Sequence, residues 1–509
     1  MSGAKGKAAR GAAWATGANL GCQLLALLFS FALARILSPR VFGLVALAWI
    51  YTAFMQIFVM QGFGIAIIQR KDLEEEHLNS AFWIAMGTAL VFCVFSVLLS
   101  VPIAHIFKEP KLAPVICWLS LLMIFTALNT VPVAVLTRDL EFKPLAIRSF
   151  LAVGLSGVIG ITMALLGCGV WSLVGQQLSS AALSAVCLWL VVPWRPHLRM
   201  SKRHLRDLYG FSLHITGNDI LWFFSKRSDQ TMVGYSFGPE GLGPYSLASK
   251  LVMFLNDGIV GPLQSVALPA LSKLQSEAKE FERAVCRYSE ISSFLVFPLF
   301  AGVAGVAPEL VPLFYGEKWL AAIPLLQVLA LYGVGQAAFS FTYPALVAKG
   351  KTGVQLATSV ILSCVTVAGC LIGARFSPKA VAYSLVVSYA LFGVSFLLVV
   401  NRILQVRPIP LMKTQIYPTI SSLFMLAAVA FLRLQIKDRV APVGTLCICI
   451  LAGIALYVGA AFLLRRDLVN TVLESFRSML MRKQSAATVP ELPELEEELS
   501  SVSSGPPMT

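Results

Sequence analysis

Apolar runs long enough to cross a lipid bilayer follow one another along almost the whole chain, and they constrain its fold more than any other feature. A membrane-spanning helix needs about 20 mostly apolar residues. In hydrocarbon, only helices and closed barrels satisfy every backbone hydrogen bond, and runs of this length exclude barrel strands. The sequence therefore predicts an all-α polytopic membrane protein with about fourteen transmembrane helices. The runs lie near 11–34, 41–68, 81–107, 111–137, 145–167, 170–193, 208–234, 244–272, 288–315, 321–348, 352–374, 379–400, 414–432 and 441–464.

Composition agrees with this class and excludes a soluble domain. Of the 509 residues, 57% are hydrophobic and only 13% are charged, whereas soluble domains carry about 25% charged residues. The net charge of +14 indicates loops at an anionic membrane surface rather than a nucleic-acid partner. We expect no cleavable signal peptide, because the first apolar run is long enough to span. The ten cysteines are scattered, so we expect no disulfide framework, metal site or cofactor.

The distribution of Lys and Arg predicts the orientation. With the N-terminus inside, 27 of the 40 basic residues fall in inside segments, 10 in outside segments and the others within spans. Positive residues concentrate on the cytoplasmic side of membrane proteins. Both termini are therefore expected in the cytoplasm.

The spans at 208–234 and 244–272 contain six charged residues. An ionised group at the bilayer centre costs about 2.5–3.5 kcal/mol, so such groups usually face an interior or a water-filled cavity. On helical spacing, Lys226 shares a face with two of the aspartates, and Lys250 is expected to meet Lys226 in the outer third of the bilayer. Two interpretations remain open: the charges pair with each other, or they line a path for a polar or anionic cargo. The six residues are Asp219, Lys226, Arg227, Asp229, Lys250 and Asp257.

An offset of 200 residues aligns two helix–turn–helix units. Positions 16–54 then match 216–254 at seven identities without a gap, and Pro39 and Gly43 of one turn fall on Pro239 and Gly243 of the other. Both units run in the same direction, as in transporters built from parallel repeats with a cargo site between the halves. The second unit carries the charges. The first carries uncharged groups that either hydrogen-bond cargo or hold helices together: Asn19, Gln23, Gln56 and Gln61.

Three segments resemble a known family. The turn at 37–44 (LSPRVFGL), its partner at 238–245 (GPEGLGPY) and residues 138–150 (RDLEFKPLAIRSF) are similar to those of Wzx-type polysaccharide flippases. These belong to the polysaccharide transporter branch of the multidrug/oligosaccharidyl-lipid/polysaccharide exporter superfamily. The resemblance covers residues 5–465 and identifies the family better than the cargo. The acidic tail after Gln484 lies outside the family's pattern.

The resemblance implies an architecture. It comprises an N-terminal six-helix lobe (1–200), a C-terminal six-helix lobe (201–405) and an extra helix pair (406–464), with the two lobes in a V shape. Residues 465–509 are expected to form a cytoplasmic amphipathic helix and a disordered acidic tail, and residues 272–290 a helix on the inner surface.

The resemblance also implies a function in the bacterial inner membrane. An undecaprenyl-pyrophosphate-linked sugar repeat unit would move from the cytoplasmic to the periplasmic leaflet. Its pyrophosphate would be bound by Lys226, Arg227 and Lys250, with Arg35 a further candidate, while Asp219, Asp229 and Asp257 would serve as counter-ions or bind a coupling ion. The expected partners are the lipid-linked glycan and membrane lipids, with a polysaccharide polymerase and export machinery as further candidates.

Other classes of protein compete with this reading. A drug/cation antiporter of the same superfamily typically has twelve helices, so the final pair at 414–464 argues against it. A membrane-embedded polysaccharide polymerase or ligase would need a sizeable outer loop, and none is visible. The chain lacks a P-loop, a zinc-binding HExxH and a Gly-x-Ser-x-Gly motif, so we expect no enzyme. A structural scaffold would explain neither the charged spans nor the repeat.

Overall fold

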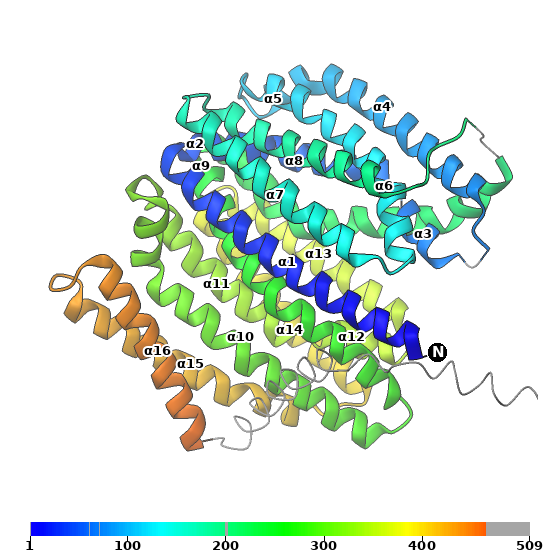
Figure 1. The fold of residues 1–509 in the computed structure, drawn as a ribbon. Helices are drawn as coiled ribbons and strands as arrows, with labels where there is room; N and C mark the ends of the chain where they lie inside the picture. Colours follow the sequence, from blue (N-terminus) through cyan, green and yellow to red (C-terminus); the bar gives the residue numbers. More distant parts are fainter. Residues whose placement is uncertain (1, 61, 71, 199–201, 465–509) are drawn as a thin grey trace, which may run out of the picture. The chain divides into compact units, whose positions relative to one another are not determined.

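The structure, a computed structural model, consists of helices throughout the part of the chain that it describes (Figure 1). It describes residues 2–60, 62–70, 72–198 and 202–464, without the side chains of 2–16, 202–215, 218, 398 and 464. Gln61 and the predicted C-terminal segment 465–509 lie outside these residues. In chain order the helices are α1 (Ser2–Ile36), α2 (Pro39–Met60), α3 (Phe63–Gln69), α4 (Glu75–Ile106), α5 (Leu112–Leu119), α6 (Leu121–Arg138), α7 (Phe142–Leu165), α8 (Val170–Val191), α9 (Lys202–Lys273), α10 (Ala278–Tyr315), η1 (Glu317–Trp319), α11 (Ala322–Ala338), α12 (Thr342–Ala348), α13 (Thr352–Gly373), α14 (Pro378–Val399), η2 (Val400–Leu404), α15 (Pro408–Ile436) and α16 (Pro442–Leu464).

The predicted polytopic all-α fold is confirmed. Within the described ranges, 13 helical segments are long and apolar enough to cross a membrane. One of them, Asp219–Lys273, is 55 residues long and includes the charged span expected at 244–272 and residues 219–234 of the one expected at 208–234. The backbone leaves helical geometry at Gly238, where φ is 64°, a value that glycine adopts without the steric cost of a Cβ. Pro239 follows, and its fixed φ suits the first position of a new helix. Counting both arms of α9 gives the expected fourteen spans.

Several predicted spans contain breaks that the sequence reading did not anticipate. The run at 41–68 is divided into α2 and α3 near Gly62, whose φ is 66°. Similar interruptions separate α5 from α6 and α11 from α12. The expectation of a separate surface helix over 272–290 is wrong, because α10 begins at Ala278 and continues unbroken to Tyr315. Its apolar positions Phe281 and Val285 are fully buried, so this face packs inside the protein.

The chain forms two compact units, Met1–Gly453 and Ile454–Thr509. Only the end of α16 is described in the second unit, and everything that follows concerns the first. The expected lobe boundaries at 200 and 405 remain a prediction.

Within the first unit, helices α1–α8 pack mainly among themselves, and so do α9–α15. Helix α1 lies against α7 along much of its length and meets α10 (Figure 1). The two groups join chiefly through α2 and α9, which form the most extensive helix pair of the unit. The helices that carry the two repeated turns are therefore the ones that connect the two groups.

The two repeated turns contact each other reciprocally. A Cβ at Gly43 would overlap the carbonyl oxygen of Pro239, and a Cβ at Gly243 would overlap the carbonyl oxygen of Pro39. Because the neighbouring atoms are backbone, this close approach requires glycine at both positions.

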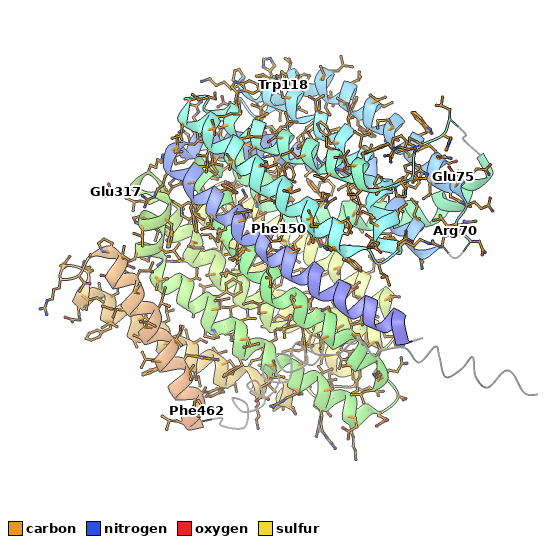
Figure 2. All side chains as sticks on the ribbon, viewed as in Figure 1. Arg70, Glu75, Trp118, Phe150, Glu317 and Phe462 are labelled. Atoms are coloured by element: carbon orange, nitrogen blue, oxygen red, sulfur yellow. The ribbon has the colours of Figure 1, made fainter. Side chains whose placement is uncertain are left out.

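The end of the bundle that holds these turns is fastened further by α1 and η1. The indole of Trp319 is fully buried; its Nε1 donates to the Ala34 carbonyl at 2.9 Å, and Lys318 Nζ donates to the Arg35 carbonyl at 2.8 Å. Glu317 lies at this end of the unit, whereas Arg70 and Glu75 lie at the opposite end (Figure 2).

Candidate functional site

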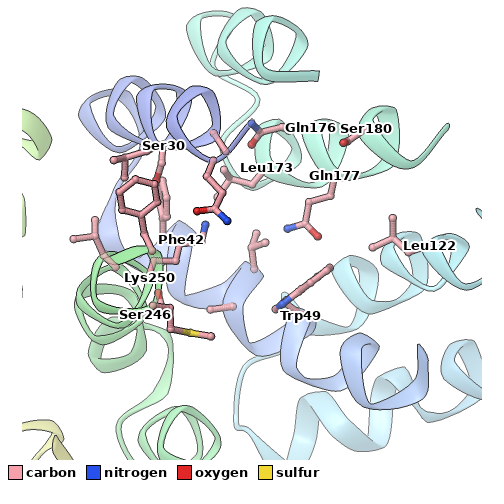
Figure 3. A pocket seen from close by; sticks show the side chains of 18 of the residues that line it. Ser30, Phe42, Trp49, Leu122, Leu173, Gln176, Gln177, Ser180, Ser246 and Lys250 are labelled. Atoms are coloured by element: carbon pink, nitrogen blue, oxygen red, sulfur yellow. The ribbon is translucent and has the colours of Figure 1, made fainter. Parts of the chain in front are cut away.

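A cavity of about 780 Å³ lies between the first group of helices and α9. Its walls come from α1, α2, α6 and α8 on one side and from α9 on the other, with Tyr315 of α10. Figure 3 shows Gln176, Gln177 and Ser180 across the space from Ser246 and Lys250. This volume is in the range of pockets that enclose a small-molecule ligand, about 300–1,000 Å³.

Among the residues that the structure describes, the charged side chains that line this cavity all come from α9. They are Arg227 before the break at Gly238, and Lys250 and Asp257 after it. Lys250 is exposed and Arg227 is half-buried, so both cations face the open space rather than a sealed interior. Arg227 Nη1 also approaches Gln230 Oε1 at 3.4 Å. Two cations and one carboxylate give the wall of α9 a net positive charge, which suits an anionic ligand.

The opposite wall is polar but uncharged. It includes Gln23 and Gln56, which were predicted from the sequence. It also includes polar residues that were not predicted, among them Asn129, Gln176, Gln177 and Ser184. Amides and hydroxyls in a span serve helix packing as often as binding. No pattern in one sequence separates these uses, so the only available signal was the pair Gln176–Gln177 within an apolar run.

Lys226 and Asp229 line a second, smaller pocket of about 100 Å³, together with Asn256 and Asp257. Lys226 and Lys250 line different pockets, and Arg227 is the cation that shares the larger cavity with Lys250. Adjacent residues on a helix point about 100° apart, which explains how Lys226 and Arg227 face different spaces.

Asp229 is buried, and its Oδ2 accepts a hydrogen bond from the hydroxyl of the fully buried Tyr245 at 2.9 Å. This bond joins the two arms of α9 across the break at Gly238. It gives Asp229 a structural partner within its own helix.

The other selected residues lie away from both pockets. Arg35 donates from Nε to the Phe314 carbonyl at 3.2 Å and also bonds the Leu313 carbonyl, so it fastens α1 to the end of α10. Asn19 is exposed, and its Oδ1 accepts from Gln23 Nε2 at 3.3 Å. Asp219 is half-buried and lines neither pocket.

The six charged residues selected in the two charged spans have described side chains, and they form no ion pair within 4 Å with one another: Asp219, Lys226, Arg227, Asp229, Lys250 and Asp257. Mutual pairing, one of the two interpretations left open by the sequence, is therefore absent from this conformation. Charges held apart in a span need water or a ligand around them, and the cavity provides the space.

Comparisons with known proteins agree with one another. Residues 32–324 match the family model described as "Polysaccharide biosynthesis protein". The chain is 26% identical to the succinoglycan biosynthesis transport protein ExoT of Rhizobium meliloti, over 67% of this chain and 74% of that protein. It is 24% identical to the lipopolysaccharide biosynthesis protein WzxC of Escherichia coli, over 73% and 76%. Among solved structures, the lipid II flippase MurJ in an inward closed conformation has a similar fold, with a TM-score of 0.74 and 16% identity over 89% of this chain and 99% of that one.

Proposed function

We propose a function for this chain on the basis of its family. The chain belongs to the family of polysaccharide biosynthesis proteins. It is a flippase that moves undecaprenyl-pyrophosphate-linked oligosaccharide repeat units from the cytoplasmic to the periplasmic leaflet of the bacterial inner membrane. The names of ExoT and WzxC, a transport and a biosynthesis protein for surface glycans, support this reading.

One observation carries the proposal. Arg227 and Lys250 face an open cavity between two groups of helices and have no ion-pair partner among the described residues. Keeping unpaired cations within an apolar span is costly, and an anionic cargo would remove that cost. Guanidinium and ammonium groups both bind phosphate well, Arg by a planar fork and Lys as a point charge.

The cargo poses a physical problem that this arrangement solves. A hydrophilic, anionic headgroup must cross about 30 Å of hydrocarbon while its polyprenyl tail stays in lipid. In our proposal Arg227 and Lys250 hold the pyrophosphate, and the amides of the facing wall replace the water around the sugar. Rocking of helices α1–α8 against α9–α14, as lobes, would then open the cavity alternately to each side.

The other candidate residues have secondary roles in the proposed transport. Asp257, in both pockets, is placed to act as counter-ion or to bind a coupling ion beside Lys226 and Lys250. Lys226 serves the smaller pocket. Both termini are cytoplasmic, and a polymerase on the periplasmic side receives the flipped repeat unit.

Depletion of the protein tests this function. A lipid-linked oligosaccharide should accumulate in the inner leaflet while surface polysaccharide falls, as measured by extracting the polyprenyl-linked lipids. Unchanged lipid-linked sugars together with increased sensitivity to amphiphilic cations would point instead to a drug/cation antiporter. Accumulation in the outer leaflet would point to a polymerase or ligase.

A further inference from the structure

A tryptophan lines the large cavity on its uncharged wall. Trp49 belongs to α2 and is half-buried, and Figure 3 shows it facing the same space as Gln177. Tryptophans of membrane proteins usually pack into a core or lie in the belts at the membrane interface. Trp49 packs only partly on the core of the unit, and the rest of its side chain borders the cavity.

Trp49 also differs from the other tryptophans described in residues 17–198. Each of the others contacts another aromatic ring, whereas no described ring stacks on Trp49 or meets it edge to face. The ring contacts are those of Trp83, Trp189 and Trp194 with Phe82, and of Trp118 with Trp171. The indole of Trp49 is therefore available to the ring of a ligand.

The indole N–H of Trp49 is an unused donor. In the described part of the chain the side-chain hydrogen bonds at this residue go to its backbone carbonyl, which accepts from Thr52 Oγ1 at 3.2 Å, and none involves the indole nitrogen. That nitrogen is not one of the buried atoms that lack a partner, so it is accessible. Indole N–H groups inside proteins usually find an acceptor, and here the acceptor has to come from the contents of the cavity.

Helix α8 presents a polar face to the same cavity. Its lining residues follow the 3.6-residue period of one helix face: Leu173, Gln176, Gln177, Ser180, Ala181 and Ser184. The amide nitrogens of Gln176 and Gln177 have no acceptor among the described residues, and neither is a buried atom without a partner. Amides that hold helices together hydrogen-bond across the helix interface. These two accessible donors are therefore better explained by a ligand in the cavity.

Trp49 and Lys250 lie at the same depth in the unit. Trp49 is ten residues beyond Pro39, and Lys250 is eleven residues beyond Pro239. The turns that begin these two helices touch each other reciprocally. At about 1.5 Å per residue, both residues lie about 15 Å along their helices from that contact. A cargo bound to Lys250 would therefore have its adjoining part beside Trp49.

A pyranose ring matches this surface chemically. One face of such a ring carries several C–H bonds, whose hydrogens are slightly positive, and the face of an aromatic ring is the negative part of its quadrupole. The oxygens around the rim of the sugar accept hydrogen bonds from N–H donors. A linear polyol offers the same oxygens without a flat C–H face.

We propose that Trp49 binds the sugar next to the pyrophosphate: the C–H face of the pyranose stacks on the indole, while Gln176 and Gln177 donate to its oxygens. This rests on the proposed flippase function and adds a sugar subsite to it. The substrate class is a lipid-linked glycan whose first sugar is a pyranose with an unobstructed C–H face.

Two synthetic cargos test the proposal with the full-length protein in proteoliposomes. Both are polyprenyl pyrophosphates; one bears a trisaccharide of glucopyranose and the other a linear polyol with the same number of hydroxyls. Translocation is measured as protection from periodate added outside the vesicles. Trp49→Leu should slow the sugar cargo roughly tenfold, and Trp49→Phe, which keeps a ring, roughly threefold. Both variants should move the polyol cargo at the wild-type rate.

Trp118→Leu is the matched control. Trp118 belongs to the same group of helices, is 54% exposed and lines neither pocket, so its replacement should change neither rate. Unchanged transport of the sugar cargo by Trp49→Leu, or equal slowing of both cargos, would overturn the inference and leave the flippase function standing. Failure of the wild-type protein to move the sugar cargo would overturn both.

Footprinting of the wild-type protein tests the same contact without a variant. Hydroxyl radicals oxidise accessible indoles, and mass spectrometry locates the products. The sugar cargo should lower oxidation of Trp49 roughly threefold, because a stacked ring covers the indole face. The polyol cargo should lower it much less, and oxidation of Trp118 should not change. Equal protection of Trp49 by the two cargos, or protection by neither, would contradict a stacked sugar.

Discussion

At the scale of single residues, neighbours in the chain have different roles. Lys226 and Arg227 are consecutive, yet they face the smaller pocket and the larger cavity respectively. Only the second of them joins Lys250, so the positive wall is made by two residues from different arms of α9.

Removing either of these two charges should reduce polysaccharide export. A hydrogen bond to a charged group contributes about 1.5–3 kcal/mol, so Arg227→Gln and Lys250→Gln should each lower export about ten- to one-hundred-fold. Surface polysaccharide is measured against the amount of inserted protein. Lys226→Gln is the matched control and should lower export much less. Equal losses in all three variants would contradict the assignment of the cargo to the larger cavity.

The Tyr245–Asp229 bond should contribute to stability. Tyr245→Phe leaves the buried carboxylate without its hydroxyl donor, which costs about 1–3 kcal/mol. The midpoint of thermal unfolding in detergent should fall accordingly. Asp229→Asn should lower the free energy of unfolding less in the Tyr245→Phe background than in the wild type, because the hydrogen bond is already absent there. If the losses in unfolding free energy are additive, the hydrogen bond contributes little to stability.

The sequence predicted these residues in part. Charges in apolar spans are conspicuous, and Arg227, Lys250 and Asp257 line the larger cavity; their roles in binding remain a prediction. The partition of Lys226 and Asp229 into a second pocket was not predictable, because it depends on how α9 is rotated against α11 and α14. Arg35 is a further candidate that the family resemblance implies, and its carbonyl partners lie far along the chain in α10.

At the scale of helices, the apolar runs predicted nearly every span but not the breaks inside them. Gly62 carries no signal that distinguishes it from a packed glycine until its positive φ is seen. The break between the two arms of α9 was visible, because a Gly-Pro pair normally indicates a turn, and the backbone leaves helical geometry at Gly238. The matching turns at Pro39–Gly43 and Pro239–Gly243 were visible as a repeat, but the repeat did not reveal that the two turns touch.

The reciprocal turn contact should tolerate no Cβ. In Gly43→Ala, the added methyl group meets the backbone of Pro239, so the helices must shift at a cost of about 1–3 kcal/mol. The unfolding midpoint in detergent should fall. Gly258→Ala is the control, because a Cβ there has no neighbour within 4 Å; an equal loss in the control would show that the turn contact is not tight.

An ion pair joins helix α15 to α10, and removal of one partner alone should strongly destabilise the protein. Arg433 Nε lies 2.5 Å from Glu309 Oε1, and both side chains are largely buried, at 24% and 12% exposure. Glu309→Gln leaves the cation uncompensated, which costs about 3–5 kcal/mol. The more exposed pair of Arg407 with Glu282 should contribute about 0–1 kcal/mol. Thermal unfolding of Glu309→Gln and Glu282→Gln compares them, and equal shifts would contradict this ranking.

At the scale of the whole first unit, the two ends of the bundle differ. One end is fastened by Trp319, Lys318 and the repeated turns, and it carries Glu317. The other end holds Arg70 and Glu75 (Figure 2). In the proposed orientation, in which basic residues concentrate on the cytoplasmic side, the second end faces the cytoplasm.

Cysteine labelling tests this orientation. In spheroplasts, a membrane-impermeant maleimide should label Glu317→Cys and leave Asp72→Cys unlabelled; both native side chains are exposed. Labelling of the unmodified protein, which has ten free cysteines, sets the background. The reverse labelling pattern would show the opposite topology, and the proposed direction of transport would then be wrong.

The reciprocal Pro–Gly contact also bears on the origin of the chain. When residue i of one copy touches residue j of another and j touches i in return, the interface is that of a twofold homodimer. An ancestor of half the length, with one such turn, could have made the same contact with a second copy of itself. Fusion of duplicated genes would have fixed the pair in one polypeptide and released each copy to diverge, one toward cations and the other toward amides.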